Sequence, residues 1–228
     1  NMYLLVNGFS FNTARGINLW GHHLEPVLFP IAHLVKFSGR PELMFVIQIF
    51  VICFGVFFVF YFSAKLTENS KTAFIISILY LLYPALHNSA LFEFHPGSLA
   101  IPFFFPLIYF LKKNRQIYAF LILFLIFSTR ENYALATACL CLYYFNENST
   151  AKYSFFISII YFAVSILVIK PYFNNGAGDL HMIYYSEFGK TPGQILLNIF
   201  FNYELTLSKL FSVNSFKYLV SLYLPLLF

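Results

Sequence analysis

The chain has 228 residues, of which 60% are hydrophobic, 22% aromatic and only 10% charged. An ordinary soluble domain has roughly 25% charged residues, and the mean hydropathy here is +0.72. This composition excludes a disordered chain and a cytosolic enzyme, and it predicts a polytopic membrane protein whose partner is the lipid bilayer. The formal charge of +5 comes from scattered basic residues, which excludes a nucleic-acid-binding domain.

Apolar runs of about 20 residues predict spanning helices. Shorter runs can also span the membrane where neighbouring helices supply the missing length. We therefore expect an all-α transmembrane helical bundle with six spans and a truncated seventh, in one domain over 1–228. A loop with a short helix occupies 1–42, spans follow in 43–173, a loop and an interfacial helix occupy 174–212, and the last span is 213–228. The apolar runs are 26–37, 43–64, 72–86, 97–111, 116–128, 133–145, 153–173 and 215–228.

The two runs within 116–145 are separated by Ser128–Asn132. A single helix over these 30 residues would be about 45 Å long, which is too long for a bilayer. The pattern therefore predicts a re-entrant pair or a short hairpin. The chain starts at Asn1 and stops inside an apolar run, so we expect a fragment of a longer protein.

The connecting segments predict the orientation of the bundle. The short connectors 65–71, 112–115 and 146–152 carry six basic and two acidic residues. Dense Lys and Arg in short loops favour the cytoplasmic side. All six histidines then fall on the opposite side, which predicts a site facing away from the cytoplasm. They are His22, His23, His33, His87, His95 and His181.

The first candidate site motif is His22-His23-Leu24-Glu25-Pro26, directly before a short apolar run. Pro26 suits a first helical position, where its missing N–H has no cost. Glu25 would then lie at the positive end of that helix. The motif is either a simple helix start with interfacial histidines, or a general base with phosphate-binding histidines at the membrane surface.

The second motif contains Glu93 and His95, flanked by Phe92 and Phe94. Residues two apart in an extended segment face the same way. Their pKa values could be tuned there by desolvation or by mutual contact. The alternative is ordinary loop packing.

The third motif is Arg130-Glu131 at the turn between two short apolar runs. Charges at membrane depth are costly and usually face a bundle interior or a wet cavity. The pair is either a structural ion pair, or it places the planar guanidinium of Arg130 on a substrate phosphate.

The fourth motif is the glycine-containing loop 174–192, which carries Lys190 and ends in Thr191-Pro192. Threonine followed by proline is typical of a helix start. The amphipathic segment 193–212 then predicts a helix at the membrane interface, or one that packs in the bundle.

No P-loop, dinucleotide-binding glycine pattern or HExxH motif occurs in the sequence. His22, His23, Glu93 and His95 could in principle bind zinc, but their spacing matches no ligand template. We predict no metal site and no cofactor, with a divalent ion as an open alternative.

In order and spacing, these motifs resemble a prokaryotic family of predicted membrane proteins, domain of unknown function 2079, from about Asn12 to Phe228. The family is grouped by fold with the GT-C membrane glycosyltransferases. Glu93 stands where the family has Asp, and Asn132 where it has an acid. The matching segments are His23-Leu24-Glu25-Pro26, Phe92-Glu93-Phe94-His95-Pro96, Arg130-Glu131-Asn132, Tyr184-Tyr185 and Thr191-Pro192-Gly193-Gln194-Ile195-Leu196.

The resemblance implies a GT-C-like glycosyltransferase in a prokaryotic inner membrane, with a polyprenyl-phosphate-linked sugar donor and an unknown acceptor. It also implies a catalytic acid upstream of Asn1, with Glu25 and Glu93 as candidates inside the chain. The expected substrate-binding residues are His22, His23, His95, Arg130 and Lys190, with Glu131 holding Arg130 in place. The alternatives are a secondary transporter or permease, and a non-catalytic lipid-binding subunit.

Overall fold

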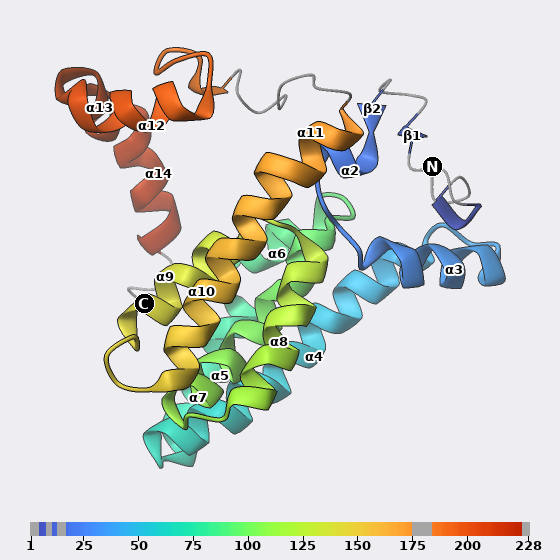
Figure 1. Cartoon of the computed structure of the whole chain (residues 1–228). Coiled ribbons are helices and arrows are strands. Elements are labelled where there is room, and N and C mark those ends of the chain that lie inside the picture. Colours follow the sequence, from blue (N-terminus) through green and yellow to red (C-terminus); the bar gives the residue numbers. More distant parts are fainter. Residues whose placement is uncertain (1–4, 8–10, 13–16, 175–183, 225–228) are drawn as a thin grey trace. The chain divides into compact units, whose positions relative to one another are not determined.

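In a computed structural model of the chain, residues 5–7, 11–12, 17–174 and 184–224 are described. The chain divides into two compact units, Asn1–Asn175 and Gly176–Phe228 (Figure 1). The first unit is a helical bundle preceded by a small antiparallel ribbon, in which β1 (Phe11–Asn12) pairs with β2 (Ile17–Asn18). The expected all-α class is therefore confirmed apart from this ribbon.

The helices of the first unit follow the apolar runs of the sequence. In chain order they are α2 (Leu19–His22), α3 (Leu28–Ser38), α4 (Leu43–Thr67), α5 (Ser70–Leu82), α6 (Pro84–Leu91), the 3₁₀ helix η1 (Pro96–Phe103), α7 (Phe104–Lys112), α8 (Gln116–Thr129), α9 (Tyr133–Tyr143), α10 (Ser149–Val164), the π-helical turn η2 (Ser165–Ile169) and α11 (Lys170–Phe173).

Polar side chains start the helices where the apolar runs begin. Asn69 Oδ1 accepts a hydrogen bond from the Lys71 N–H at 2.9 Å, and Asn148 Oδ1 accepts one from the Ala151 N–H at 2.8 Å. Each bond satisfies a donor that the first helical turn would leave unpaired. Pro84 cannot continue α5, so the chain bends and α6 begins there.

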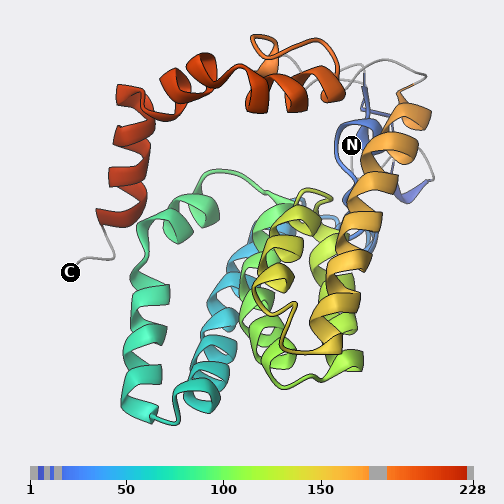
Figure 2. The same ribbon diagram turned by 60° about the vertical axis from the view of Figure 1, so that its left-hand side comes forward.

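The bundle packs through small residues. α4 lies along α5 and contacts η1 and α7, while α9 pairs with α10 (Figure 2). Across the second pair, the hydroxyls of Thr137 and Ser158 are 3.0 Å apart, and both residues are fully buried. Small side chains let membrane helices approach closely, and their hydroxyls bond between helices. The buried core around them includes Ala100, Ala119, Leu123, Ile126, Ala134, Cys141 and Ala151.

Large apolar side chains cover the outside of the bundle. Phe50, Phe57, Phe124 and Leu167 are each well over half exposed. A soluble protein rarely exposes continuous apolar surface of this kind. These side chains are suited to contact with lipid, which agrees with the apolar composition.

Our expectation of six to seven spans was wrong for the described residues. Only Leu43–Thr67 and Ser149–Phe173 are long and apolar enough to cross a membrane, and α5 with α6 would make a third if this pair, bent by 44°, is one span. The run 97–111 forms η1 and α7, which together make the shorter apolar helix Pro96–Lys112, and the turn at Arg130–Asn132 limits α8 to 14 residues. Such a helix is about 21 Å long, against a hydrocarbon core of about 30 Å.

The hairpin expected over 116–145 agrees with the structure, in which α8 and α9 are separate helices. The second unit contains α12 (Pro192–Phe201), α13 (Tyr203–Leu210) and α14 (Val213–Tyr223). The expected single helix over 193–212 is thus divided, because Asn202 ends α12 and caps α13 by accepting from the Leu205 N–H. The predicted truncated span 213–228 coincides with α14 over Val213–Tyr223, and residues 225–228 of this prediction lie outside the described residues.

Candidate functional site

Arg130 and Glu25 form an ion pair at one end of the first unit. Arg130 Nε and Nη2 both donate to Glu25 Oε1, at 3.1 and 3.0 Å. The side chains are 29% and 12% exposed, so the pair is accessible from outside. Among the described residues, Arg130 Nη1 and Glu25 Oε2 have no hydrogen-bond partner. The pair therefore keeps the N–H groups of Nη1 and the acceptor Oε2 for a ligand.

Glu131, the next residue of the turn, binds different partners. Its Oε1 accepts from His23 Nδ1 at 3.0 Å and from Lys170 Nζ at 3.3 Å, and its Oε2 accepts from the Leu24 N–H at 2.9 Å. Glu131 is fully buried, and Lys170 is 3% exposed. Our prediction that Glu131 holds Arg130 was wrong. Glu25 holds Arg130, because the Glu131 carboxylate is turned into the bundle by one ammonium, one imidazole and one backbone N–H.

The two carboxylates have opposite pKa shifts. Burial raises the pKa of Glu25 above its ordinary value, although Arg130 and His23 attract its negative form. Burial also works against ionisation of Glu131, but the hydrogen bond and charge of His23, followed by Lys170, outweigh it and lower this pKa to about 2. Glu25 is thus the better base, and Glu131 is a fixed structural anion.

The segment that carries His23 and Glu25 is extended rather than helical, and it is fastened to the ends of two helices. The backbone at His23 has φ −138° and ψ 139°. The Val27 N–H donates to the Ser128 carbonyl at 2.8 Å, at the end of α8. Asn174 Nδ2 donates to the Gly21 carbonyl at 2.8 Å, just beyond α11. These bonds hold Glu25 beside the α8–α9 turn.

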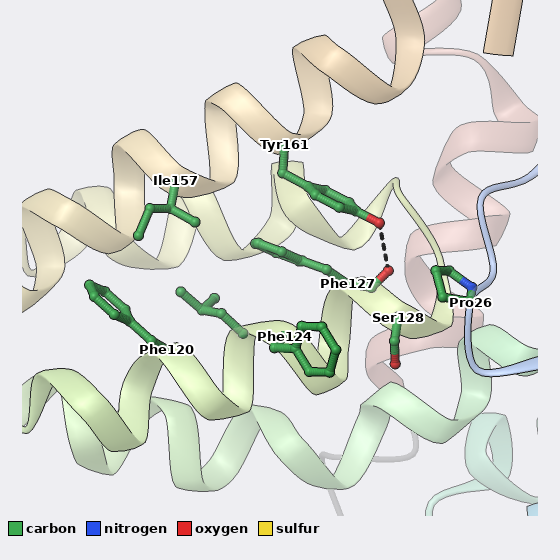
Figure 3. A pocket seen from close by; sticks show the side chains of 8 residues that line it. Pro26, Phe120, Phe124, Phe127, Ser128, Ile157 and Tyr161 are labelled. Atoms are coloured by element: carbon green, nitrogen blue, oxygen red, sulfur yellow. Dashed lines mark hydrogen bonds between the residues drawn. The ribbon is translucent and has the colours of Figure 1, made fainter. Parts of the chain in front are cut away.

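An apolar groove of about 340 Å³ lies along α8 (Figure 3). Along α8 it runs from Phe120 to Ser128, a rise of about 12 Å. Pro26, which follows Glu25, and Ser128, two residues before Arg130, both line it, so the groove and the pair adjoin. The lining residues are Pro26, Phe120, Leu123, Phe124, Phe127, Ser128, Ile157 and Tyr161.

One wall of the groove is a rigid aromatic pair. The rings of Phe127 and Tyr161 stack with centroids 4.6 Å apart and an interplanar angle of 14°. The Tyr161 hydroxyl donates to the Phe127 carbonyl at 3.0 Å, so its polar end is satisfied (Figure 3). The surface presented to a ligand is therefore almost wholly apolar, which suits a hydrocarbon chain.

Glu93 and His95 form a separate pair on the segment between α6 and η1. Glu93 Oε1 and His95 Nε2 are 3.5 Å apart, and both side chains are about half exposed. Their expected proximity is confirmed, but no contact joins them to Arg130 within the described residues. Phe94 between them packs against the cluster that contains Leu28 of α3.

Gln48, a fully buried residue of α4, holds the segment that carries Glu93 and His95 by hydrogen bonds to its backbone. Gln48 Nε2 donates to the carbonyls of Ser89 and Glu93, each at 3.1 Å. Its Oε1 accepts from the His95 N–H at 2.7 Å. One side chain thus supplies the backbone bonds that this turn lacks.

The remaining predicted site residues lie elsewhere. The ring of His22 meets that of His23 edge to face, with centroids 4.3 Å apart. Lys190 belongs to the second unit, where its backbone N–H donates to Gln194 Oε1 at 3.0 Å. His181 lies outside the described residues. In the described part of the chain, no group of three or more His, Cys, Asp or Glu side chains is arranged to hold a metal ion.

Lys170 and Gln48 were not predicted as site residues, although the sequence contains a signal for each. Each is a polar residue inside a long apolar run, 153–173 for Lys170 and 43–64 for Gln48. Ionisable and strongly polar residues within spanning helices usually face the bundle and have partners there.

The described bundle, with its apolar exterior and buried ion network, defines an integral membrane protein of helical type. The chain belongs to the family described as predicted membrane protein (DUF2079), which matches residues 2–228. No curated protein and no solved structure matches the chain.

Proposed function

We propose that the protein is an integral membrane glycosyltransferase of GT-C type. It transfers a sugar from a polyprenyl phosphate at the outer face of a prokaryotic inner membrane, to an acceptor that is not identified. The observation that carries this proposal is the accessible Arg130–Glu25 pair at the end of an apolar groove. A lipid-linked sugar has the matching parts, which are a long hydrocarbon chain, an anionic phosphate and a reacting sugar.

Each part of the site has a role in this proposal. The groove along α8 holds the proximal part of the polyprenyl chain, and Arg130 binds the phosphate with the free edge of its guanidinium. An acceptor hydroxyl then attacks the anomeric carbon while the bond to the phosphate oxygen breaks. The phosphate leaves with the electron pair, stabilised by Arg130.

Glu25 takes the proton of the acceptor hydroxyl. Its raised pKa makes it a stronger base than an ordinary carboxylate. Binding of the phosphate to Arg130 would also weaken the Arg130–Glu25 bond and release the carboxylate at the moment it is needed. Glu93 is the other candidate base within the chain, and His95, His23 and His22 are further candidates for phosphate contacts.

The test is sugar transfer from radiolabelled polyprenyl-phosphate donors by the full-length protein in membranes. We expect Arg130→Ala to lower kcat by about 10²–10³, as removal of one electrostatic stabiliser does, and Glu25→Gln to lower it by about 10²–10⁴. Because the pKa of Glu25 is raised, the acidic limb of the wild-type rate profile should lie above pH 4.5.

Matched controls are Arg115→Ala and Glu147→Gln, which remove exposed charges outside this site. These variants should transfer sugar at wild-type rates. Wild-type transfer by Arg130→Ala and Glu25→Gln would remove the site assignment, and absence of transfer from every donor would remove the reaction.

The orientation is tested by single cysteines in a chain whose own three cysteines are replaced. We expect an impermeant thiol reagent to label Asn88→Cys in intact cells, and Lys113→Cys only after permeabilisation, because the basic connectors favour the cytoplasm. Both positions are exposed. The reverse labelling pattern would place the Arg130–Glu25 pair on the cytoplasmic face.

A secondary transporter is the second candidate, and the bent helix pair α5–α6 favours it. Transporter sites are commonly built from discontinuous helices around buried charges. Solute uptake into proteoliposomes by a protein that transfers no sugar would favour this function over the first.

A further inference from the structure

Along the helix that contains Lys170, the number of residues per turn increases just before this residue. The buried positions of α10 include Ser154 and Ser158, and the next is Ser165 at the start of η2. These spacings of four and seven residues keep the three side chains on one face of an α-helix. The next buried residue is Lys170, five positions after Ser165. The Lys170 N–H donates to the Ser165 carbonyl, which closes a π-helical turn over Ser165–Ile169.

This turn decides where Lys170 points. In a continuous α-helix, residue 169 would take the buried position, and Lys170 would lie about 100° further round the helix, toward the lipid-facing side. That side carries Leu167 and Val168, which are 68% and 59% exposed. The π turn accommodates one extra residue, so the ammonium faces Glu131 instead. Such turns inside α-helices are often found at functional sites.

From this position α11 holds the extended segment at two points. Lys170 Nζ binds Glu131 Oε1, and the same carboxylate accepts from His23 Nδ1 and the Leu24 N–H. One helical turn later, Asn174 Nδ2 donates to the Gly21 carbonyl. Residues four apart lie on the same face of a helix. Lys170 and Asn174 therefore present two donors to the segment that ends in Glu25.

We propose that Lys170, aimed inward by the π turn, is a positioning residue that fixes the Glu25 segment against the bundle through Glu131. Among the described residues, Lys170 Nζ binds Glu131 and Lys170 does not line the groove, so it acts on Glu25 through Glu131 and the backbone of residues 23 and 24. Its effect on catalysis rests on the proposed transferase function, whereas its effect on the segment does not.

The position of the segment is measured first, by the rate at which a hydrophilic thiol reagent labels Leu24→Cys in a chain without its native cysteines. We expect Lys170→Met to accelerate labelling several-fold, and Lys170→Arg to keep the slow rate because it keeps a cation. Lys152→Met is the matched control, since it removes an exposed lysine near the other end of the same helix.

Changes in helix length test the role of the π turn. Deleting Val168 brings Lys170 to four residues from Ser165, which a regular α-helix accommodates with the lysine still facing inward. Inserting an alanine after Val168 makes the spacing six, which turns the lysine away. We therefore expect slow labelling for the deletion and fast labelling for the insertion. Equal rates for the two, or wild-type labelling in Lys170→Met, would overturn the proposal.

Kinetics provide the second measurement. Misplacement of a catalytic group by about 1 Å can cost roughly 10²-fold in rate, so Lys170→Met should lower kcat strongly while KM for the lipid-linked donor changes little. Lys170→Arg should restore kcat. If the labelling results hold but the wild-type protein transfers no sugar, the positioning role stands and the transferase function fails. An equal loss in the arginine variant would overturn the positioning role.

Discussion

Replacing Glu131 with glutamine is expected to destabilise the first unit by about 3–5 kcal/mol, as removal of one partner from a buried ion pair does. The cost arises because the buried ammonium of Lys170 loses the negative charge of the Glu131 carboxylate. The two acceptor oxygens are reduced to one, so the His23 and Leu24 donors also compete for it. Unfolding in a denaturing detergent series, followed by the fluorescence of Trp20, measures the change.

The double variant Glu131→Gln with Lys170→Met should regain most of this stability. It removes the buried ammonium that has lost the Glu131 charge, while the glutamine carbonyl still accepts from the Leu24 N–H. Replacement of a whole buried ion pair is often neutral or stabilising. Glu93→Gln is the control, because its half-exposed carboxylate should contribute less than about 0.5 kcal/mol. A Glu131→Gln protein within about 1 kcal/mol of the wild type would show that the network is not stabilised by charge.

The same network predicts how stability depends on acid. The folded pKa of Glu131 is lowered from 4.5 to about 2, so its contribution is complete above pH 4.5 and is lost as the pH falls from 4.5 toward 2. The wild type should lose stability in this range more steeply than Glu131→Gln does. If the free energy of unfolding depended on pH in the same way in both proteins, Glu131 would not be the group whose lowered pKa stabilises the fold.

The grouping of the residues at the α8–α9 turn could be predicted from the sequence, but their pairing could not, and Glu93 and His95, expected in the same site, form a separate pair. A chain with few charges and an apolar exterior has few places where those charges can be satisfied, so Glu25, His23, Arg130 and Glu131 were expected together and lie together. Which carboxylate binds Arg130 depends on how the turn after α8 directs two neighbouring side chains. Hydropathy and residue type contain no information about that direction.

The span count failed for a related physical reason. Hydropathy identifies apolar segments, but it does not say where a helix breaks or how deeply each segment enters the bilayer. The expected span 72–86 is limited to the 13 residues of α5, and α6 begins at Pro84 and extends into the expected loop. In the expected span 97–111, the 3₁₀ helix η1 replaces the first half. The π turn before Lys170 could not be predicted either. Its only sign is the five-residue spacing between the buried residues Ser165 and Lys170, and burial is known only from the structure.

Replacing Gln48 with leucine is expected to cost about 1–3 kcal/mol and to loosen the segment that carries Glu93 and His95. The substitution leaves the His95 N–H and the carbonyls of Ser89 and Glu93 without their partner. Each unsatisfied buried polar group costs about 1–3 kcal/mol, and partial access to water limits the sum here. The leucine itself should fit, since its side chain has nearly the volume of the fully buried glutamine side chain that it replaces.

Hydrogen exchange separates this local effect from general instability. The His95 amide should exchange much faster in Gln48→Leu, while amides in the middle of α10 keep their wild-type protection. Gln116→Leu, at the exposed start of α8, is the matched control. It should change neither the exchange of the His95 amide nor that of the α10 amides. If His95 stayed protected in Gln48→Leu, the turn would be held by its own backbone and by the packing of Phe94, and a buried glutamine in a spanning helix would need another explanation. If the amide becomes labile, the role of the polar side chain in the second turn of α4 is to hold the loop that carries Glu93 and His95.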